Sequence, residues 1–388
     1  MYFQEIKEQD QTYILPTYGR VDVALVKGKN ARAWDAEGKE YIDFTSGIGV
    51  NALGYSDPQW AAAVGEQAGK IQHLCNYYYS PENTALAESL CQAAGMGKAF
   101  FCNSGAEANE CAIKIARKYG EKRGAAKIVT LENSFHGRTL TTLAATGQAG
   151  FHKQFLPLTE GFLYAKAGDL PGIQALLDGS VCAVMLEMVQ GEGGVIPMDE
   201  GFVQGLEKLC RERDVLLLMD EVQTGVGRTG TFYAYQGYGV EPDVVTTAKG
   251  LAGGLPMGAC LVSKALGDIL QPGENGSTFG GNPVACAGAR VVVDRVSEPA
   301  FLKSVTEKGT YLRAKLEALP QVEYVRGKGL MLGAKLKNKD AHDVLVQCAK
   351  AGLLVLTAKE LVRFLPPLTI EKEDIDQGLA IFQKVLEG

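Results

Sequence analysis

The sequence predicts an α/β fold in which a large, mostly parallel sheet carries helices on both faces and is followed by a smaller α+β domain. In the middle of the chain, short apolar stretches of strand length alternate with amphipathic stretches of helical period. Strands that are apolar throughout are typical of a parallel sheet buried on both faces. From residue 282 onward the pattern changes to long helical stretches and then to several short strands, which indicates a second unit.

The predicted elements of the large sheet follow one another along the middle of the chain. Strands are expected at 98–102, 127–132, 162–165, 181–187, 215–221, 244–249 and 258–263, with helices at 105–119 and 200–213. Open parallel sheets bind ligands beyond the carboxyl ends of their strands. Residues just after these strands are therefore the first candidates for a functional site.

The flanking regions complete the predicted organisation. Residues 1–49 are expected to pack with the C-terminal part, residues 50–285 to form the large domain and residues 286–388 the small one. A helical pattern at 282–319 contains Pro299, which breaks or kinks a helix. Short strands are expected at 322–329, 330–336, 353–356 and 361–365, and an amphipathic helix after Thr369.

The composition is that of a globular protein without a strongly charged surface. Of the 388 residues, 46% are hydrophobic and 22% charged, and the net charge of −6 comes without long runs of one sign. This excludes a basic surface for nucleic acid or anionic membranes.

The N-terminus has no apolar core of signal-peptide length, so we expect a cytoplasmic protein. The nine cysteines are expected to be reduced, and the four histidines form no metal-binding pattern, so no metal is predicted.

A glycine motif resembles a dinucleotide-binding loop but lacks its context. Gly225, Gly227 and Gly230 have the G-x-G-x-x-G spacing after the strand at 215–221. A dinucleotide fold needs a helix to begin there, whereas the aromatic, turn-rich "TFYAYQGYG" follows. We therefore expect these glycines to shape a loop.

The segment "CNSGAEANE" follows a strand and begins a helix. Ser104 and Glu107 have the spacing of a capping box, which is the purely structural interpretation. The backbone N–H groups of Gly105 and Ala106 would then lie at a helix N-terminus, where a phosphate can bind.

Two charged residues end strands of the predicted sheet. Asp220 ends "VLLLMD", where a carboxylate is costly to bury unpaired, and Gln223 follows it. Lys249 ends "VVTTAK". Asp220 alone or Lys249 alone is compatible with a solvated or salt-bridged strand end. Together with the anion site, however, Lys249 indicates an amine that reacts with a carbonyl, and Asp220 indicates a carboxylate that pairs with a ring nitrogen. An aldehyde cofactor that carries a phosphate and such a ring is pyridoxal 5′-phosphate (PLP).

The sequence resembles the class III (ornithine-type) aminotransferases, which have the fold type I of PLP-dependent transferases. The resemblance covers nearly the whole chain, and its blocks occur in the family's order. They are "GKEYIDFTSGIGVNALGY", "FFCNSGAEANE", "SFHGRT", "VQGEGG", "LLLMDEVQTGVGRTG", "AKGLAGGLPMGA", "GSTFGGNPVACA" and "LVRFLPPLTI".

The resemblance implies a set of cofactor-binding residues. These are Gly105, Ala106, Phe135, Asp220, Gln223, Lys249 and Thr278. Lys249 would attach the cofactor and later move a proton, and Asp220 would keep the ring nitrogen protonated. Phe135 would stack on the ring, Gln223 would lie near its phenolic oxygen, and Gly105 and Ala106 would bind the phosphate. Thr278 would reach the phosphate of a neighbouring subunit, so a homodimer with shared active sites is implied.

The resemblance also implies substrate-binding residues. These are Arg138, Ser277 and Arg363. The two arginines would bind carboxylates, because a guanidinium matches a carboxylate with two hydrogen bonds. Glu192 would pair with Arg363 while an amino donor with one carboxylate is bound, and would release it for 2-oxoglutarate. His136 is expected to be structural.

The implied reaction moves the δ-amino group of N-acetylornithine to 2-oxoglutarate, giving N-acetylglutamate semialdehyde and glutamate in arginine biosynthesis. Succinylornithine, ornithine, 4-aminobutyrate and succinyldiaminopimelate stay open as donors. An aminomutase and a catalytically silent cofactor-binding protein are the remaining alternatives. The chain departs from the family at three places: "YSDP" at 55–58, Ala106 where some relatives have Thr, and Met188 where Pro is common.

Overall fold

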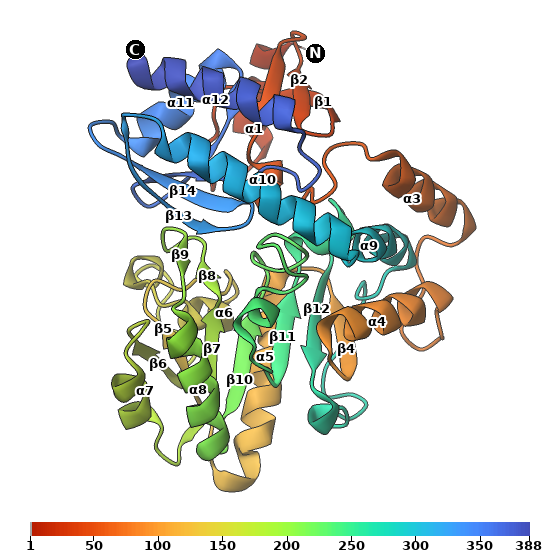
Figure 1. Ribbon diagram of the computed structural model, residues 1–388. Coiled ribbons are helices and arrows are strands. Elements are labelled where there is room, and N and C mark those ends of the chain that lie inside the picture. Colours follow the sequence, from red (N-terminus) through yellow and green to blue (C-terminus); the bar gives the residue numbers. More distant parts are fainter. Residues whose placement is uncertain (1) are drawn as a thin grey trace.

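A computed structural model describes residues 2–388, and its centre is a seven-stranded sheet (Figure 1). The strands lie in the order β4 (Lys98–Cys102), β12 (Gly258–Val262), β11 (Val244–Thr247), β10 (Leu216–Asp220), β7 (Val181–Glu187), β5 (Lys127–Leu131) and β6 (Phe162–Ala165). Only β12 runs antiparallel to its neighbours. The fold is therefore the predicted α/β architecture of fold type I, and the carboxyl ends of six strands meet at one edge.

Alternate residues of these strands belong to two apolar cores, one on each face of the sheet. Leu216 and Leu218 of β10 pack with helix α5 (Gly105–Gly120), whereas Leu217 and Met219 pack with helix α8 (Glu200–Glu212). All seven residues of β7 are buried, as expected for a strand covered on both faces. The helices thus fix the strand ends that carry the candidate site.

Two smaller sheets and their helices lie above the strand ends in Figure 1. One contains β1 (Leu25–Lys29), β2 (Arg32–Asp35), β3 (Glu40–Asp43) and β15 (Leu353–Leu354), and the other β13 (Val322–Lys328), β14 (Met331–Leu336), β17 (Leu361–Phe364) and β16 (Leu356–Ala358). Because β3 pairs with β15, the N-terminal strands share a sheet with the C-terminal part. The domain boundaries themselves stay a prediction.

The other elements connect or cover these sheets. The helices are α1 (Phe3–Tyr13), α3 (Pro58–Lys70), α4 (Pro81–Ala94), α6 (Leu140–Ala145), α7 (Leu170–Leu176), α9 (Pro283–Val296), α10 (Pro299–Glu317), α11 (Ala341–Ala351) and α12 (Lys372–Glu387), and β8 (Val189–Gln190) pairs with β9 (Ile196–Pro197). The helical pattern at 282–319 is interrupted before Pro299, as predicted. Within residues 2–388, no helix is both long and apolar enough to span a bilayer.

The segment Ser46–Gly49, labelled α2, is a turn of left-handed backbone. The φ angles are +42° at Ser46, +64° at Gly47, +64° at Ile48 and +79° at Gly49. A β-branched residue such as Ile48 pays for this conformation, so the surrounding structure must enforce it. Asp43 and the buried Arg228 hold the turn in this conformation. Asp43 accepts hydrogen bonds from the backbone N–H groups of Thr45 and Ser46, and Nη2 of Arg228 lies 3.5 Å from the Ser46 hydroxyl.

The glycine motif at 225–230 forms the loop that carries Arg228. Gly227 and Gly230 have φ angles of +80° and +98°, and they are followed by a short 3₁₀ turn at Ala234–Tyr238 instead of the α-helix that a dinucleotide-binding loop needs. Arg228 donates to the carbonyl oxygens of Leu330 and Pro366 from inside the protein. The loop therefore ties the large sheet to the C-terminal part, which is a structural role.

Candidate active site

A cavity of about 410 Å³ lies at the carboxyl ends of β7, β10 and β11, where a parallel sheet offers its binding site. Its wall includes Asn103, Gly105, Ala106, Asn109, Phe135, His136, Arg138, Glu187, Asp220, Gln223 and Lys249. Six of the predicted cofactor-binding residues are thus brought together, although they come from positions far apart in the chain.

Lys249 lies two residues beyond the end of β11 and begins a short 3₁₀ turn, rather than ending the strand as predicted. Its φ of +43° is left-handed, an unusual conformation for a lysine. Burial lowers the pKa of Lys249; the Glu192 carboxylate opposes this effect and the Arg363 guanidinium adds to it. A lowered pKa increases the fraction of neutral amine, which is the nucleophilic form.

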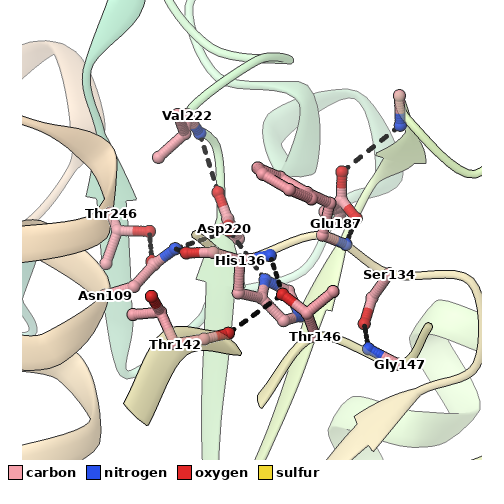
Figure 2. A network of polar contacts seen from close by, with 12 residues as sticks. Asn109, Ser134, His136, Thr142, Thr146, Gly147, Glu187, Asp220, Val222 and Thr246 are labelled. Atoms are coloured by element: carbon pink, nitrogen blue, oxygen red, sulfur yellow. Dashed lines mark hydrogen bonds and ion pairs between the residues drawn. The ribbon is translucent and has the colours of Figure 1, made fainter. Parts of the chain in front are cut away.

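Asp220 ends β10 and is only 3% exposed, and each of its two carboxylate oxygens has a hydrogen-bond partner (Figure 2). Oδ2 accepts a hydrogen bond from Asn109 Nδ2 at 2.8 Å and lies 2.7 Å from His136 Nδ1, while Oδ1 accepts from the Val222 backbone N–H at 3.0 Å. These contacts hold the carboxylate in one orientation.

A second layer of hydrogen bonds fixes the partners of Asp220 (Figure 2). Asn109 also donates to the His136 carbonyl at 2.7 Å and accepts from the Thr246 hydroxyl at 2.6 Å. The His136 backbone N–H donates to the Thr146 hydroxyl at 3.0 Å. The His136 ring is therefore a direct partner of the carboxylate at the cavity wall, and its expected structural role stays a prediction. The chain separation of 84 residues hides this contact from the sequence.

The N-terminus of α5 is the predicted anion site, and it lies at the cavity wall. Ser104 caps the helix by accepting from the Glu107 N–H at 3.2 Å, and Glu107 accepts in return from the Ser104 hydroxyl and the Asn103 N–H, both at 2.9 Å. The N–H groups of Gly105 and Ala106 belong to the first turn and have no intrahelical partner. A Cβ at Gly105 would come within 2.6 Å of the Val222 side chain, so a larger residue would clash there.

Arg363 of β17 is 3% exposed and forms an ion pair with Glu192; neither residue lines the cavity itself, but Arg363 contacts Gln223 of its wall. Its Nη1 donates to Glu192 Oε1 at 2.6 Å and to Gln223 Oε1 at 3.2 Å. Burial by itself raises the pKa of Glu192, but the Arg363 guanidinium outweighs it and lowers the pKa below its usual range. The Glu192 carboxylate is thus charged at neutral pH, and it meets a guanidinium 171 residues away in the chain.

Arg138 is exposed at the cavity and lies against two aromatic rings. Its guanidinium carbon is 5.5 Å from the centre of the Phe135 ring and 4.2 Å from that of Phe151. Among the contacts of residues 2–388 it has no ion pair with a carboxylate. Phe151 was not predicted, because an isolated aromatic residue in a loop carries no recognisable signal. The arrangement leaves the guanidinium fork free for an anionic ligand.

Ser277 and Thr278 do not line this cavity. The Ser277 hydroxyl lies 3.1 Å from Asn103 Nδ2 and from the Gly280 N–H, which is the turn chemistry that sequence alone would favour. Thr278 is exposed. The neighbouring side chains of Phe279, Tyr77 and Tyr79 are 61%, 96% and 98% exposed, an unusual concentration of apolar surface.

Comparison with known proteins agrees with this geometry. Residues 13–386 match the family described as aminotransferase class-III. The acetylornithine aminotransferase of Haemophilus ducreyi is 48% identical over 391 residues, which cover 100% of this chain and 99% of that protein. The succinylornithine transaminase of Yersinia enterocolitica is 44% identical over 388 residues, covering 95% and 93%.

Solved structures extend the comparison to the fold. An ornithine aminotransferase from Toxoplasma gondii, described as having partial occupancy of PLP at its active site, superposes with a TM-score of 0.93 at 30% identity. The match covers 99% of this chain and 94% of that chain. Because the family match and the relatives span nearly the full length, this chain belongs to the class III aminotransferases.

Proposed function

We propose that this protein is a PLP-dependent aminotransferase that moves the δ-amino group of N-acetylornithine to 2-oxoglutarate, the reaction expected in arginine biosynthesis. The single observation that carries the proposal is the cavity in which the Lys249 amine and the Asp220 carboxylate lie beside a free helix N-terminus. The names of the acetylornithine aminotransferase relatives support the choice of donor, and the Toxoplasma gondii structure supports the cofactor.

The residues present match the chemical groups of PLP. The first-turn N–H groups of Gly105 and Ala106 would hold the phosphate, and the packing of Val222 against this turn requires the small Gly105. Asp220, fixed by Asn109 and His136, would hold the ring nitrogen in its protonated state. When bound, the cofactor supplies an electron sink for the carbon from which a proton is removed.

Lys249 has two tasks in this proposal. Its amine, whose neutral form is favoured by burial, would be the group that holds the cofactor. The same Nζ would accept the proton from the substrate carbon and return it elsewhere, as a general base and acid. Phe135, partly buried at the cavity wall, would cover one face of the ring.

The two arginines distinguish the substrates. Exposed Arg138 would bind the carboxylate that every substrate carries at its far end, while Arg363 would bind the second carboxylate of 2-oxoglutarate. While N-acetylornithine is bound, Glu192 would keep the charge of Arg363 neutralised, a role that the ion pair of 2.6 Å supports. Succinylornithine is the second candidate donor, because a succinylornithine transaminase is 44% identical.

A panel of amino donors with 2-oxoglutarate tests the donor. N-Acetylornithine is expected to have the highest kcat/KM, ahead of succinylornithine, ornithine and 4-aminobutyrate. A tenfold preference for any other donor would contradict N-acetylornithine as the substrate, but the protein would still be an aminotransferase.

The attachment site is tested separately. Reduction of the PLP-loaded protein with borohydride, followed by peptide mass spectrometry, should place the label on Lys249. Lys249→Ala should fold, take up no label and have no measurable turnover, and Lys264→Ala, a lysine outside the cavity, is the control. A label on another lysine would overturn the assignment.

We further propose a homodimer that completes the site. The exposed Thr278 lies beside the exposed Phe279, and Tyr77 and Tyr79 add further uncovered aromatic surface. Thr278→Ala should weaken PLP binding without lowering the melting temperature. Heterodimers of Lys249→Ala chains with inactive Thr278 variants should regain activity, since one hybrid site would be intact; no recovery in verified heterodimers would count against sharing.

A further inference from the structure

A second carboxylate lies beside Asp220 at the cavity wall and has no part in the reaction described above. Glu187 is the last residue of β7, directly paired with Asp220 of β10 in the parallel register. Its side chain is 5% exposed and lines the same cavity. A carboxylate is expensive to bury, so its presence in the wall requires a reason.

The two oxygens of Glu187 join two separate segments of the site (Figure 2). Oε1 accepts a hydrogen bond from the Phe135 backbone N–H at 2.9 Å, and Oε2 accepts from the Gly191 backbone N–H at 3.3 Å. Phe135 is in the loop that also carries Arg138, and Gly191 immediately precedes Glu192 in the turn between β8 and β9. One side chain therefore contacts both the Phe135 loop and the Glu192 turn.

Other contacts show that the turn rests on the loop. Gln190 Nε2 donates to the Glu132 carbonyl at 2.8 Å, and a Cβ at Gly193 would come within 2.5 Å of the Asn133 carbonyl oxygen. The position of Glu192, and with it the pairing of Arg363, thus depends on where the loop before Arg138 lies.

We propose that Glu187 is a positioning residue that couples the two carboxylate-binding arginines by holding the Phe135 loop and the Glu192 turn together. The proposal rests on the proposed function, because it concerns the selection between substrates with one and two carboxylates. Only a carboxylate offers an acceptor oxygen to both N–H groups at once; an amide of the same shape has one.

The charge of Glu187 is sensitive to pH. Burial raises the pKa of Glu187 to about 7, His136 opposes this effect, and Asp220 adds to it. Lys249 is the other charged group that interacts with Glu187. Below that pH the protonated group has an O–H in place of one acceptor, so the bridge should loosen as the pH falls from 8 to 6.

Hydrogen exchange of the protein without cofactor or substrate tests the bridge itself. Glu187→Gln should accelerate exchange about tenfold in at least one of the two peptides that contain Phe135 and Gly191, since its amide can accept only one of the two bonds and a lost bond to a charged acceptor corresponds to at least that factor. Glu132→Gln, an exposed carboxylate at the start of the same loop, is the matched control and should change neither. Glu187→Asp, which keeps two acceptors, should restore part of the protection.

Substrate selection tests the consequence. In Glu187→Gln the ratio of kcat/KM for N-acetylornithine to that for glutamate should fall about tenfold. In the wild type this ratio should fall as the pH is lowered from 8 to 6, and in Glu187→Gln this pH dependence should be lost. A variant that exchanges like the wild type in both peptides, or keeps the ratio within twofold, would overturn the proposal. Failure of the wild type to use N-acetylornithine, with the exchange result intact, would instead count against the proposed donor.

Discussion

Arg138 lines the cavity and Arg363 contacts Gln223 of its wall, and the two guanidinium groups are in opposite environments. Arg363 is 3% exposed in a strand and is already paired with Glu192, whereas Arg138 is exposed, unpaired with any carboxylate of residues 2–388, and held between Phe135 and Phe151. A buried cation without a partner is costly, but an exposed one is not. The difference supports the proposal that Arg138 serves every substrate and that Arg363 serves a substrate only when its pair with Glu192 opens.

The largest expected effect comes from removing the buried arginine. Arg363→Ala should slow the half-reaction with 2-oxoglutarate about 10²- to 10³-fold, because a buried charge pair loses one partner and the second carboxylate loses its cation. The half-reaction with N-acetylornithine should slow no more than about tenfold. Stopped-flow spectra of each half-reaction measure both. Arg363→Lys, which keeps the positive charge but not the two-pronged guanidinium, is the control. Equal losses in both half-reactions of Arg363→Ala would mean that the pair is purely structural.

Removing the exposed arginine should act on both halves. Arg138→Ala should raise KM for N-acetylornithine and for 2-oxoglutarate by about 10- to 100-fold, the range of a charge-assisted bidentate contact. Steady-state kinetics with each substrate varied in turn measure this, with Arg211→Ala on the surface of α8 as the control. An effect on one substrate only would break the comparison.

Much of this arrangement follows from local sequence patterns, and the rest depends on contacts across the chain. The strands at 181–187 and 215–221 are recognisable because they are buried on both faces, and the cap at Ser104 because its partner Glu107 is three residues away. The antiparallel direction of β12 has no local signal, since its residues pack alike in either direction. Helix α11 was not predicted, because its short apolar pattern is interrupted by charged residues.

The site itself was predictable mainly through the family resemblance. Residue chemistry indicated Lys249, Asp220 and the helix N-terminus, whereas the pairing of Glu192 with Arg363 joins positions 171 residues apart. His136 and Glu187 were not recognised as parts of the site, because only the fold brings them to Asp220. Ser277 and Thr278 were predicted site residues that lie outside the cavity of a single chain.

A smaller effect separates the two arginines by their exposure. Raising the ionic strength from 0.05 to 0.5 M should increase KM for N-acetylornithine about two- to threefold, because salt screens an exposed cation more than a buried one. The salt dependence should disappear in Arg138→Ala and persist in Arg363→Lys. A salt dependence that survives the loss of Arg138 would place the screened charge elsewhere.

The smallest effect concerns the amine of Lys249. Arg363 lowers the pKa of Lys249 and Glu192 raises it, so Arg363→Met should raise this pKa and Glu192→Gln should lower it. The pH dependence of labelling by an amine-reactive reagent, read on the Lys249 peptide of the cofactor-free protein, gives both directions. Shifts of the same sign in the two variants would contradict the opposed charges.

The pairing of Glu192 with Arg363 is tested most directly by single-turnover spectra of wild type and Glu192→Gln with N-acetylornithine and with glutamate. The amide cannot neutralise Arg363, so the cation stays open to the α-carboxylate of glutamate. The account predicts that Glu192→Gln reacts more slowly with N-acetylornithine and faster with glutamate, shifting the ratio of the two rates by about tenfold, which corresponds to about 1.4 kcal/mol. An unchanged ratio, with both rates reduced alike, would contradict the masking of Arg363 by Glu192.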